Sequence, residues 1–163
     1  MLPKHMLAYP TVFAVDKSYN IFVPFDDEVI MWVKVGDNVY YDDCNGILRS
    51  NTNMHKVELP MSVLDAEKKY TVVYKKMIDR KPYFPESEET VEITYKFRPV
   101  KRGKAVNLFH VSDTHGRVEQ SVAAAKNRFG DNVDLLVLNG DISDHSSSVA
   151  NISMIYRIAS GIT

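Results

Sequence analysis

Two short apolar segments of this chain each end in side chains that can hold a metal ion. Val106–Val111 leads to Asp113 and His115, and Leu135–Leu138 leads to Asp141. Carboxylate oxygens and imidazole nitrogens suit Mn, Fe and Zn, and one carboxylate can span two cations about 3.5 to 4 Å apart. Two bridged cations activate water for attack on a phosphate ester, so no side-chain nucleophile is required. The residue types and their spacing therefore indicate a metal site for hydrolysis.

The segments around these side chains follow a strand–helix–strand–helix pattern. Apolar residues at helical spacing predict a helix over 118–129, and Gly130 suits a left-handed C-terminal cap. A second helix is predicted for residues 148–160, with one of the serines 146–148 as its N-cap and Gly161 as its end. This alternation is typical of a parallel α/β sheet.

A parallel α/β sheet would bring the metal-ligand candidates together. Ligands bind beyond the carboxyl ends of parallel strands, and both candidate loops follow strands at that edge. We therefore expect Asp113, His115 and Asp141 to meet there, with Gly140 allowing close backbone approach. Taken alone, each of these aspartates is more often a helix cap or a turn residue. The prediction therefore rests on the occurrence of both motifs, each at the end of a strand.

The two blocks Ser112–His115 and Asn139–Asp144 resemble those of the calcineurin-like metallophosphoesterases, whose pattern is D-x-H, then G-D-x-x-D, then G-N-H-[DE]. The resemblance implies that Asp113 and His115 bind one divalent ion and that Asp141 bridges to a second. It implies Mn, Fe or Zn as the metal and a phosphate monoester or diester as the substrate. It also implies that the domain is an α/β catalytic domain.

Other polar side chains near these blocks have less definite roles. Asp144 is a candidate for orienting a ligand or the loop, and a solvent-exposed cap is its alternative. His145 stands where the family often has an arginine, so the question whether His145 contacts substrate is left open. His110, within the first strand, is expected to pack or to support a ligand rather than to bind metal. His5 and His55 are expected on the surface.

The family's third block and its later histidine ligands do not occur in these 163 residues. The resemblance therefore implies that the general-acid histidine is missing and leaves the catalytic side chain unknown. We expect residues 100–163 to be the N-terminal part of a longer phosphoesterase domain, and the chain alone to be an inactive fragment. Two parallel strands with helices on one face also leave an apolar surface that favours self-association.

Residues 1–99 are expected to form an all-β domain. Runs with strand-like alternation recur between turn signals, and Asn45-Gly46 is a strong signal for a tight hairpin turn. The strands are predicted at 29–35, 39–41, 56–59, 70–78 and 90–97, the last two joined by a long polar loop.

The segment Leu64–Val72 resembles the tyrosine corner of fibronectin type III and immunoglobulin-like sandwiches. The resemblance implies that the Tyr70 hydroxyl bonds to upstream backbone and that Trp32 is the core tryptophan. A half-buried tyrosine in another sandwich is the alternative. The polar, basic segment 99–104 marks a domain boundary. The predicted fold is thus two-domain, an N-terminal all-β sandwich followed by a truncated α/β domain.

Composition limits the other functions. The formal net charge is −1 without a basic run, so a nucleic-acid footprint is not indicated. The apolar runs are too short for a membrane span, the N-terminus lacks a signal peptide, and the single cysteine, Cys44, agrees with a reducing compartment. We expect a cytoplasmic metal-dependent phosphoesterase. The alternative is a non-catalytic binding module built on the sandwich.

Overall fold

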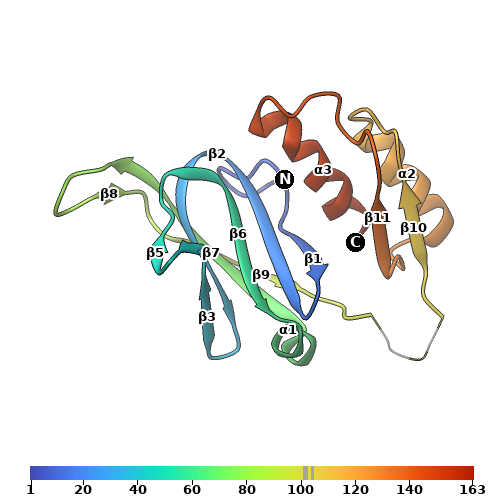
Figure 1. Cartoon of the computed structure of the whole chain (residues 1–163), viewed down its shortest axis with the longest axis horizontal. Helices are drawn as coiled ribbons and strands as arrows, with labels where there is room; N and C mark the ends of the chain where they lie inside the picture. The colour runs from blue at the N-terminus through green and yellow to red at the C-terminus, as the bar shows by residue number, and fades with distance from the viewer. Residues whose placement is uncertain (101–102, 104) are drawn as a thin grey trace.

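The structure is a computed structural model that describes residues 1–100, 103 and 105–163. The described chain is mostly β, with one large antiparallel sheet and three helices (Figure 1). Most of the predicted basic boundary segment, residues 101, 102 and 104, lies outside the described residues. Within the described part, no helix is long and apolar enough to cross a membrane.

The elements follow one another in a long β-rich part and a short α/β part. They are β1 (Thr11–Val15), β2 (Ser18–Val35), β3 (Asn38–Tyr41), β4 (Asp43–Cys44), β5 (Ile47–Leu48), β6 (Thr52–Pro60), α1 (Met61–Glu67), β7 (Lys69–Asp79), β8 (Glu86–Ser87), β9 (Val91–Lys96), β10 (Leu108–Val111), α2 (Val118–Phe129), β11 (Leu135–Leu138) and α3 (Val149–Ile162). Each strand predicted from the sequence is present, and β4 and β5 form the predicted hairpin around Asn45-Gly46.

The long strand β2 organises the large sheet. Its first half pairs with β1 and β6, and its second half pairs with β7 and β3, all antiparallel. The register with β6 shifts between Pro24 and Val29, where the proline removes a ladder donor. Strand β7 extends the sheet through β9 and β8. The sheet is continuous because β2 belongs to both of its halves.

Alternate residues of β2 face the main hydrophobic core. Val29, Met31 and Val33 are fully buried, together with Phe25. Trp32 is half-buried and is not a member of this core. Successive side chains of a strand point to opposite faces, so Met31 and Trp32 cannot share one. The prediction that Trp32 is the core tryptophan is therefore wrong.

Tyr70 is buried, but it does not make the predicted corner contact. Its ring stacks on Tyr95, with centroids 5.6 Å apart. In the described residues its hydroxyl has no hydrogen bond to upstream backbone, and the residues just before it form the short helix α1. Burial raises the pKa of Tyr70, and burial also raises the pKa of Tyr95 to about 12. The tyrosine therefore contributes packing at this position.

The two strands and two helices predicted after residue 105 are confirmed. β10 and β11 pair in parallel, with Phe109 opposite Leu136. The sheet face that carries Phe109 and Leu136 packs against α2 and α3 in a second hydrophobic cluster. Its buried members are Val118, Ala125, Val133, Ile142, Ile158 and Ile162. The outer face of the small sheet is uncovered, and it carries Leu108, Leu135 and Val137, which are 37 to 49% exposed.

Helix α3 lies between the large sheet and the small one (Figure 1). The ring of Tyr156 stacks on Phe22 at a centroid distance of 5.7 Å and meets the ring of Phe13 edge-on at 6.2 Å. Other residues of the helix pack against α2 and the small sheet. The helix therefore connects the two hydrophobic clusters of the molecule.

Helix α3 begins at its predicted cap but does not end where predicted. The Ser148 hydroxyl accepts a hydrogen bond from the Asn151 backbone N–H. Gly161 lies inside the helix, and a Cβ added there would come within 2.7 Å of Val122 Cγ2 on α2. The missing side chain of Gly161 therefore permits the close approach of the two helices.

We expect Gly161→Ala to destabilise the protein by about 1 to 3 kcal/mol because the new methyl group overpacks this contact. The loss should exceed the gain of about 1 kcal/mol that alanine brings to a helix interior. Urea unfolding would compare this variant with Gly161→Ala/Val122→Ala, which removes the clashing methyl groups and should be less impaired than the sum of its parts. An unchanged midpoint for Gly161→Ala would show that the overpacking costs no more than alanine gains in the helix.

Candidate metal centre

The loops that follow β10 and β11 are joined by backbone hydrogen bonds at the carboxyl edge of the small sheet. At distances of 2.9 to 3.2 Å these bonds are Asp113 N to Gly140 O, His115 N to Asp141 O, Gly116 N to Ile142 O, and Asn139 N to Val111 O. The two loops therefore lie side by side, each backbone supporting the other.

Buried residues between the candidate ligands anchor these loops. Thr114 is 6% exposed, and its hydroxyl donates a 2.8 Å hydrogen bond to the carbonyl oxygen of Ile142, which is itself buried. Asp113, His115 and Asp141 are exposed. Ile142 thus belongs to the hydrophobic cluster and Thr114 is buried by its bond to it, while the metal-ligand candidates face solvent.

All three ligand candidates have left-handed backbone conformations. The φ angles are 54° at Asp113, 47° at His115 and 35° at Asp141. Aspartate and histidine enter this region more readily than most residues other than glycine, but each such position still costs free energy, up to about 1 to 3 kcal/mol, that the surroundings must offset. The hydrogen bonds between the loops impose it here. Strain of this kind gathers at functional sites.

Asp144 contacts the imidazole of His115. Its Oδ1 atom lies 2.5 Å from His115 Nδ1, and the side chains are 56% and 48% exposed. A pair this exposed adds little stability, because solvent screens it. The contact does orient the ring, because it occupies Nδ1 and leaves Nε2 available to bind a metal ion.

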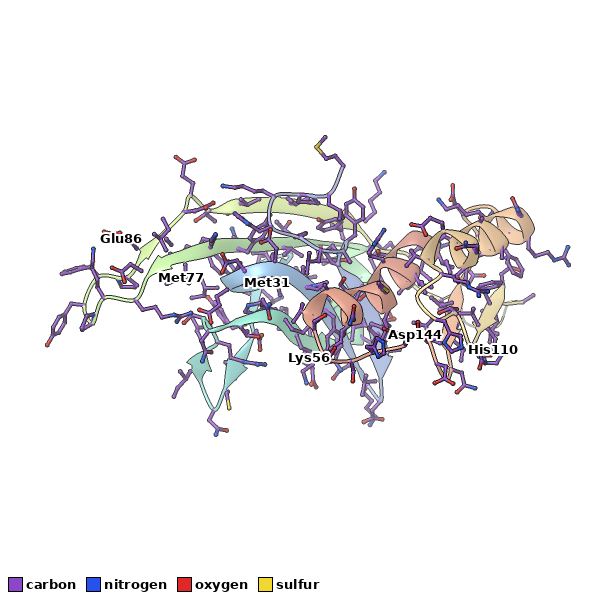
Figure 2. All side chains as sticks on the ribbon, turned by 90° about the horizontal axis from the view of Figure 1, so that it is seen from above. Met31, Lys56, Met77, Glu86, His110 and Asp144 are labelled. Atoms are coloured by element: carbon purple, nitrogen blue, oxygen red, sulfur yellow. The ribbon has the colours of Figure 1, made fainter. Side chains whose placement is uncertain are left out.

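His110 and His145 are the other two candidates. His110 projects from the outer face of β10 opposite Val137, and it is exposed (Figure 2). His145 is also exposed, and its backbone carbonyl accepts a hydrogen bond from the Ser143 hydroxyl at 3.0 Å. Neither imidazole has a contact that links it to the other candidate ligands among the described residues.

The candidate ligands share an edge of the sheet without forming a finished ligand set. In the part of the chain that the structure describes, no three His, Cys, Asp or Glu side chains are grouped so that they could hold a metal ion. The backbones of Asp113, His115 and Asp141 meet, and their donor atoms are carboxylate oxygen and imidazole nitrogen. That donor chemistry fits a divalent transition ion.

Sequence reasoning missed two residues that shape this edge. Thr114 was treated only as the variable position between two ligands, although its hydroxyl fastens the loop. Gly116 has a φ of 73°, and a Cβ there would lie 2.8 Å from Met154 Sδ. A glycine directly after a candidate ligand is a signal for such a close approach.

No family model, curated protein or solved structure matches this chain.

Proposed function

We propose that this chain belongs to a metal-dependent phosphoesterase of the calcineurin-like type, which hydrolyses a phosphate monoester or diester. The observation that carries the proposal is the pair of hydrogen-bonded loops that hold Asp113, His115 and Asp141 in left-handed conformations at one sheet edge. In this proposal residues 100–163 supply the first part of an α/β catalytic domain. Residues 1–99 supply an all-β domain.

The side chains of the two loops take different roles in this proposal. Asp113 and His115 would hold one divalent ion, and the Asp141 carboxylate would be shared with a second. Asp144 Oδ1 lies 2.5 Å from His115 Nδ1, so Nε2 is the ring nitrogen that would bind the ion. The ions, when bound, activate a water molecule and offset charge on the phosphate oxygens. Gly140 does not make the close backbone approach expected of it, because no atom lies within 4 Å of a Cβ built there; its φ of 59° is what favours glycine.

Calorimetric titration of residues 1–163 with Mn²⁺ and Zn²⁺ tests this assignment. We expect one ion per chain to bind weakly, because the two loops offer few protein donors and leave the remaining coordination to water. Asp141→Ala should abolish the binding heat. Asp131→Ala, which removes an exposed carboxylate beyond α2, is the matched control and should leave the heat unchanged. Equal heats for both variants would refute the assignment.

A non-catalytic binding module is the second candidate. It is favoured by the polar loop between β7 and β9, which exposes Tyr83 and Phe84 almost completely. Exposed aromatic side chains are typical of protein contacts. A chain that binds no divalent ion but retains a partner contact through this loop would fit this candidate and not the phosphoesterase.

A further inference from the structure

The N-terminal segment, residues 3–9, lies along the large sheet as a strap. Two backbone hydrogen bonds of 2.9 Å join the strap to β2. They run from the Leu7 N–H to the Pro24 carbonyl oxygen and from the Asp26 N–H to the His5 carbonyl oxygen. Met6, which lies between these bonds, is 5% exposed and belongs to the main hydrophobic core. The strap therefore covers part of that core.

The His5 imidazole lies between two carboxylates that belong to different parts of the sheet. Its Nδ1 atom is 3.0 Å from Asp26 Oδ1 on β2, and its Nε2 atom is 3.2 Å from Oε2 of Glu88, directly after β8. The His5 side chain is only 12% exposed. Residues 79–89, which include β8, project from the large sheet as an arm (Figure 1). The ring therefore connects three segments: the strap, β2 and the base of the arm.

Both contacts of the His5 ring are hydrogen bonds only when the ring carries two protons. A neutral imidazole has one N–H and one lone pair, so one of its nitrogens would face a carboxylate oxygen with no hydrogen between them. The protonated ring donates from both nitrogens, one to each carboxylate, and the opposite charges strengthen both bonds. Histidine side chains gain and lose this proton around pH 6.5. The attachment of the strap therefore depends on pH near neutrality.

The other charged and titratable groups around the ring are of types that titrate far from neutral pH. They are Lys4 on the strap, Asp26 and Asp27 on β2, Tyr74 and Lys76 on β7, and Glu88. The Lys4 ammonium and then His5 lower the pKa of Glu88, and the Lys76 ammonium lowers the pKa of Asp27. Burial raises the pKa of Tyr74, and the Asp27 carboxylate raises the pKa of Lys76. These shifts move the neighbouring groups still further from the range in which histidine titrates.

We propose that His5 is a pH-sensitive switch, whose protonated ring fastens the strap to β2 and to the base of the arm, and which releases the strap when the ring loses its proton. The stabilising effect is present at low pH, where the ring is charged, and is lost as the pH rises through the range of histidine. The contact between Lys4 and Glu88 persists at both limits, so the sheet stays folded while the strap opens more often. Opening uncovers Met6 and frees the base of the arm.

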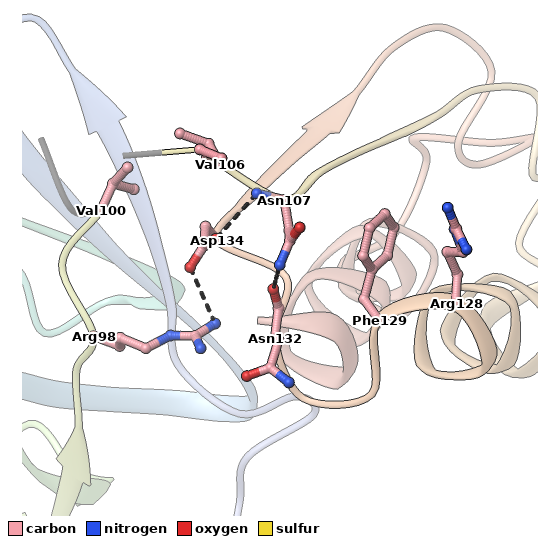
Figure 3. A pocket seen from close by; sticks show the side chains of 9 residues that line it. Arg98, Val100, Val106, Asn107, Arg128, Phe129, Asn132 and Asp134 are labelled. Carbon is pink, nitrogen blue, oxygen red and sulfur yellow. Dashed lines mark hydrogen bonds and ion pairs between the residues drawn. The ribbon is translucent and has the colours of Figure 1, made fainter. Parts of the chain in front are cut away.

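Amide hydrogen exchange of the full chain, measured by NMR between about pH 5 and pH 8 and corrected for the intrinsic effect of pH on exchange, tests the switch. Protection of the Leu7 and Asp26 amides should fall by about threefold or more as the pH rises. The amides of Asn107 and Asp134 are an internal reference, because they bond to Asp134 Oδ2 and the Asn107 carbonyl oxygen beside the cavity of Figure 3. The charged partner there is Arg98, which does not titrate in this range, so their protection should stay constant.

Variants separate the charge of the ring from other effects. His5→Asn suits the left-handed backbone of His5, whose φ is 66°, but carries no charge, so the Leu7 and Asp26 amides should be weakly protected at every pH. Asp26→Asn/Glu88→Gln keeps the histidine and should likewise abolish the pH dependence. His110→Asn, which removes an exposed histidine of the small sheet, is the matched control and should behave as the wild type. The proposal is overturned if wild-type protection does not change with pH, or if either of the first two variants retains the wild-type fall.

Discussion

The native gene product is expected to hydrolyse an aryl phosphate ester in Mn²⁺ and to lose about a hundredfold or more of that rate when Asp141 becomes Asn. The amide oxygen of asparagine carries no net charge and cannot bridge two cations as a carboxylate does. Asp141 also sits at the junction of the two loops, where its carbonyl oxygen accepts the His115 N–H. Initial rates with a nitrophenyl phosphate would measure the effect.

Further variants distinguish loss of metal ligands from general damage to the loops. Asp113→Asn and His115→Ala should resemble Asp141→Asn, and a chelator should stop the wild-type reaction. Asp131→Asn should be as active as the wild type, because that exposed carboxylate lies away from the sheet edge. Residues 1–163 alone should act near background, since their loops supply few ligands. Hydrolysis that survives chelation, or Asp141→Asn with the wild-type rate, would contradict the metal assignment.

The α/β part was predictable because its signals are local. The helix over 118–129 follows from apolar spacing and the glycine behind it, and both strands are short apolar runs between turn residues. The meeting of the two loops follows from the rule for parallel strands. The left-handed conformations at Asp113, His115 and Asp141 were not predictable, because they arise from hydrogen bonds between loops that are distant in sequence.

The orientation of β2 was harder to predict, because both of its faces carry apolar residues. Met31 and Val33 alternate with Ile30 and Trp32, so the period of two defines two faces without showing which is buried. The resemblance to immunoglobulin-like sandwiches favoured the tryptophan, but the structure buries the face of Met31. The choice depends on β6 and β7, which are distant in sequence and add Val57, Leu59, Val72 and Tyr74 to the core that contains Met31.

The burial of His55 also depends on residues that are distant in sequence. The prediction that this histidine lies on the surface is wrong, since its exposed fraction is 0%. The centroid of its ring lies 5.8 Å from that of the Phe25 ring, and its Nδ1 atom lies 2.8 Å from Oδ2 of Asp42. Asp42 is 3% exposed. A buried polar partner of this kind has no periodic signal in the sequence.

The surroundings of the pair determine where its protons lie. His55 Nε2 is 3.1 Å from the Val29 carbonyl oxygen and 3.2 Å from that of Thr52, so this nitrogen carries hydrogen. His55 Nδ1 faces the Asp42 carboxylate at 2.8 Å, without the alignment of a hydrogen bond. The Lys56 backbone N–H donates to the same carboxylate at 3.3 Å.

Asp42→Ala is expected to lower the free energy of unfolding by about 1 to 3 kcal/mol, because it leaves the buried His55 Nδ1 and the Lys56 backbone N–H without their carboxylate partner. Urea unfolding at neutral pH would measure the loss, with Asp43→Ala, an exposed neighbour, as a control that should stay within about 0.5 kcal/mol of the wild type. Asp42→Leu/His55→Leu should recover much of the stability, since apolar side chains can replace two buried polar partners at little cost. A loss below about 1 kcal/mol for Asp42→Ala would mean that water or Arg49, whose Nη1 lies 3.6 Å from Asp42 Oδ1, already relieves the burial of this pair.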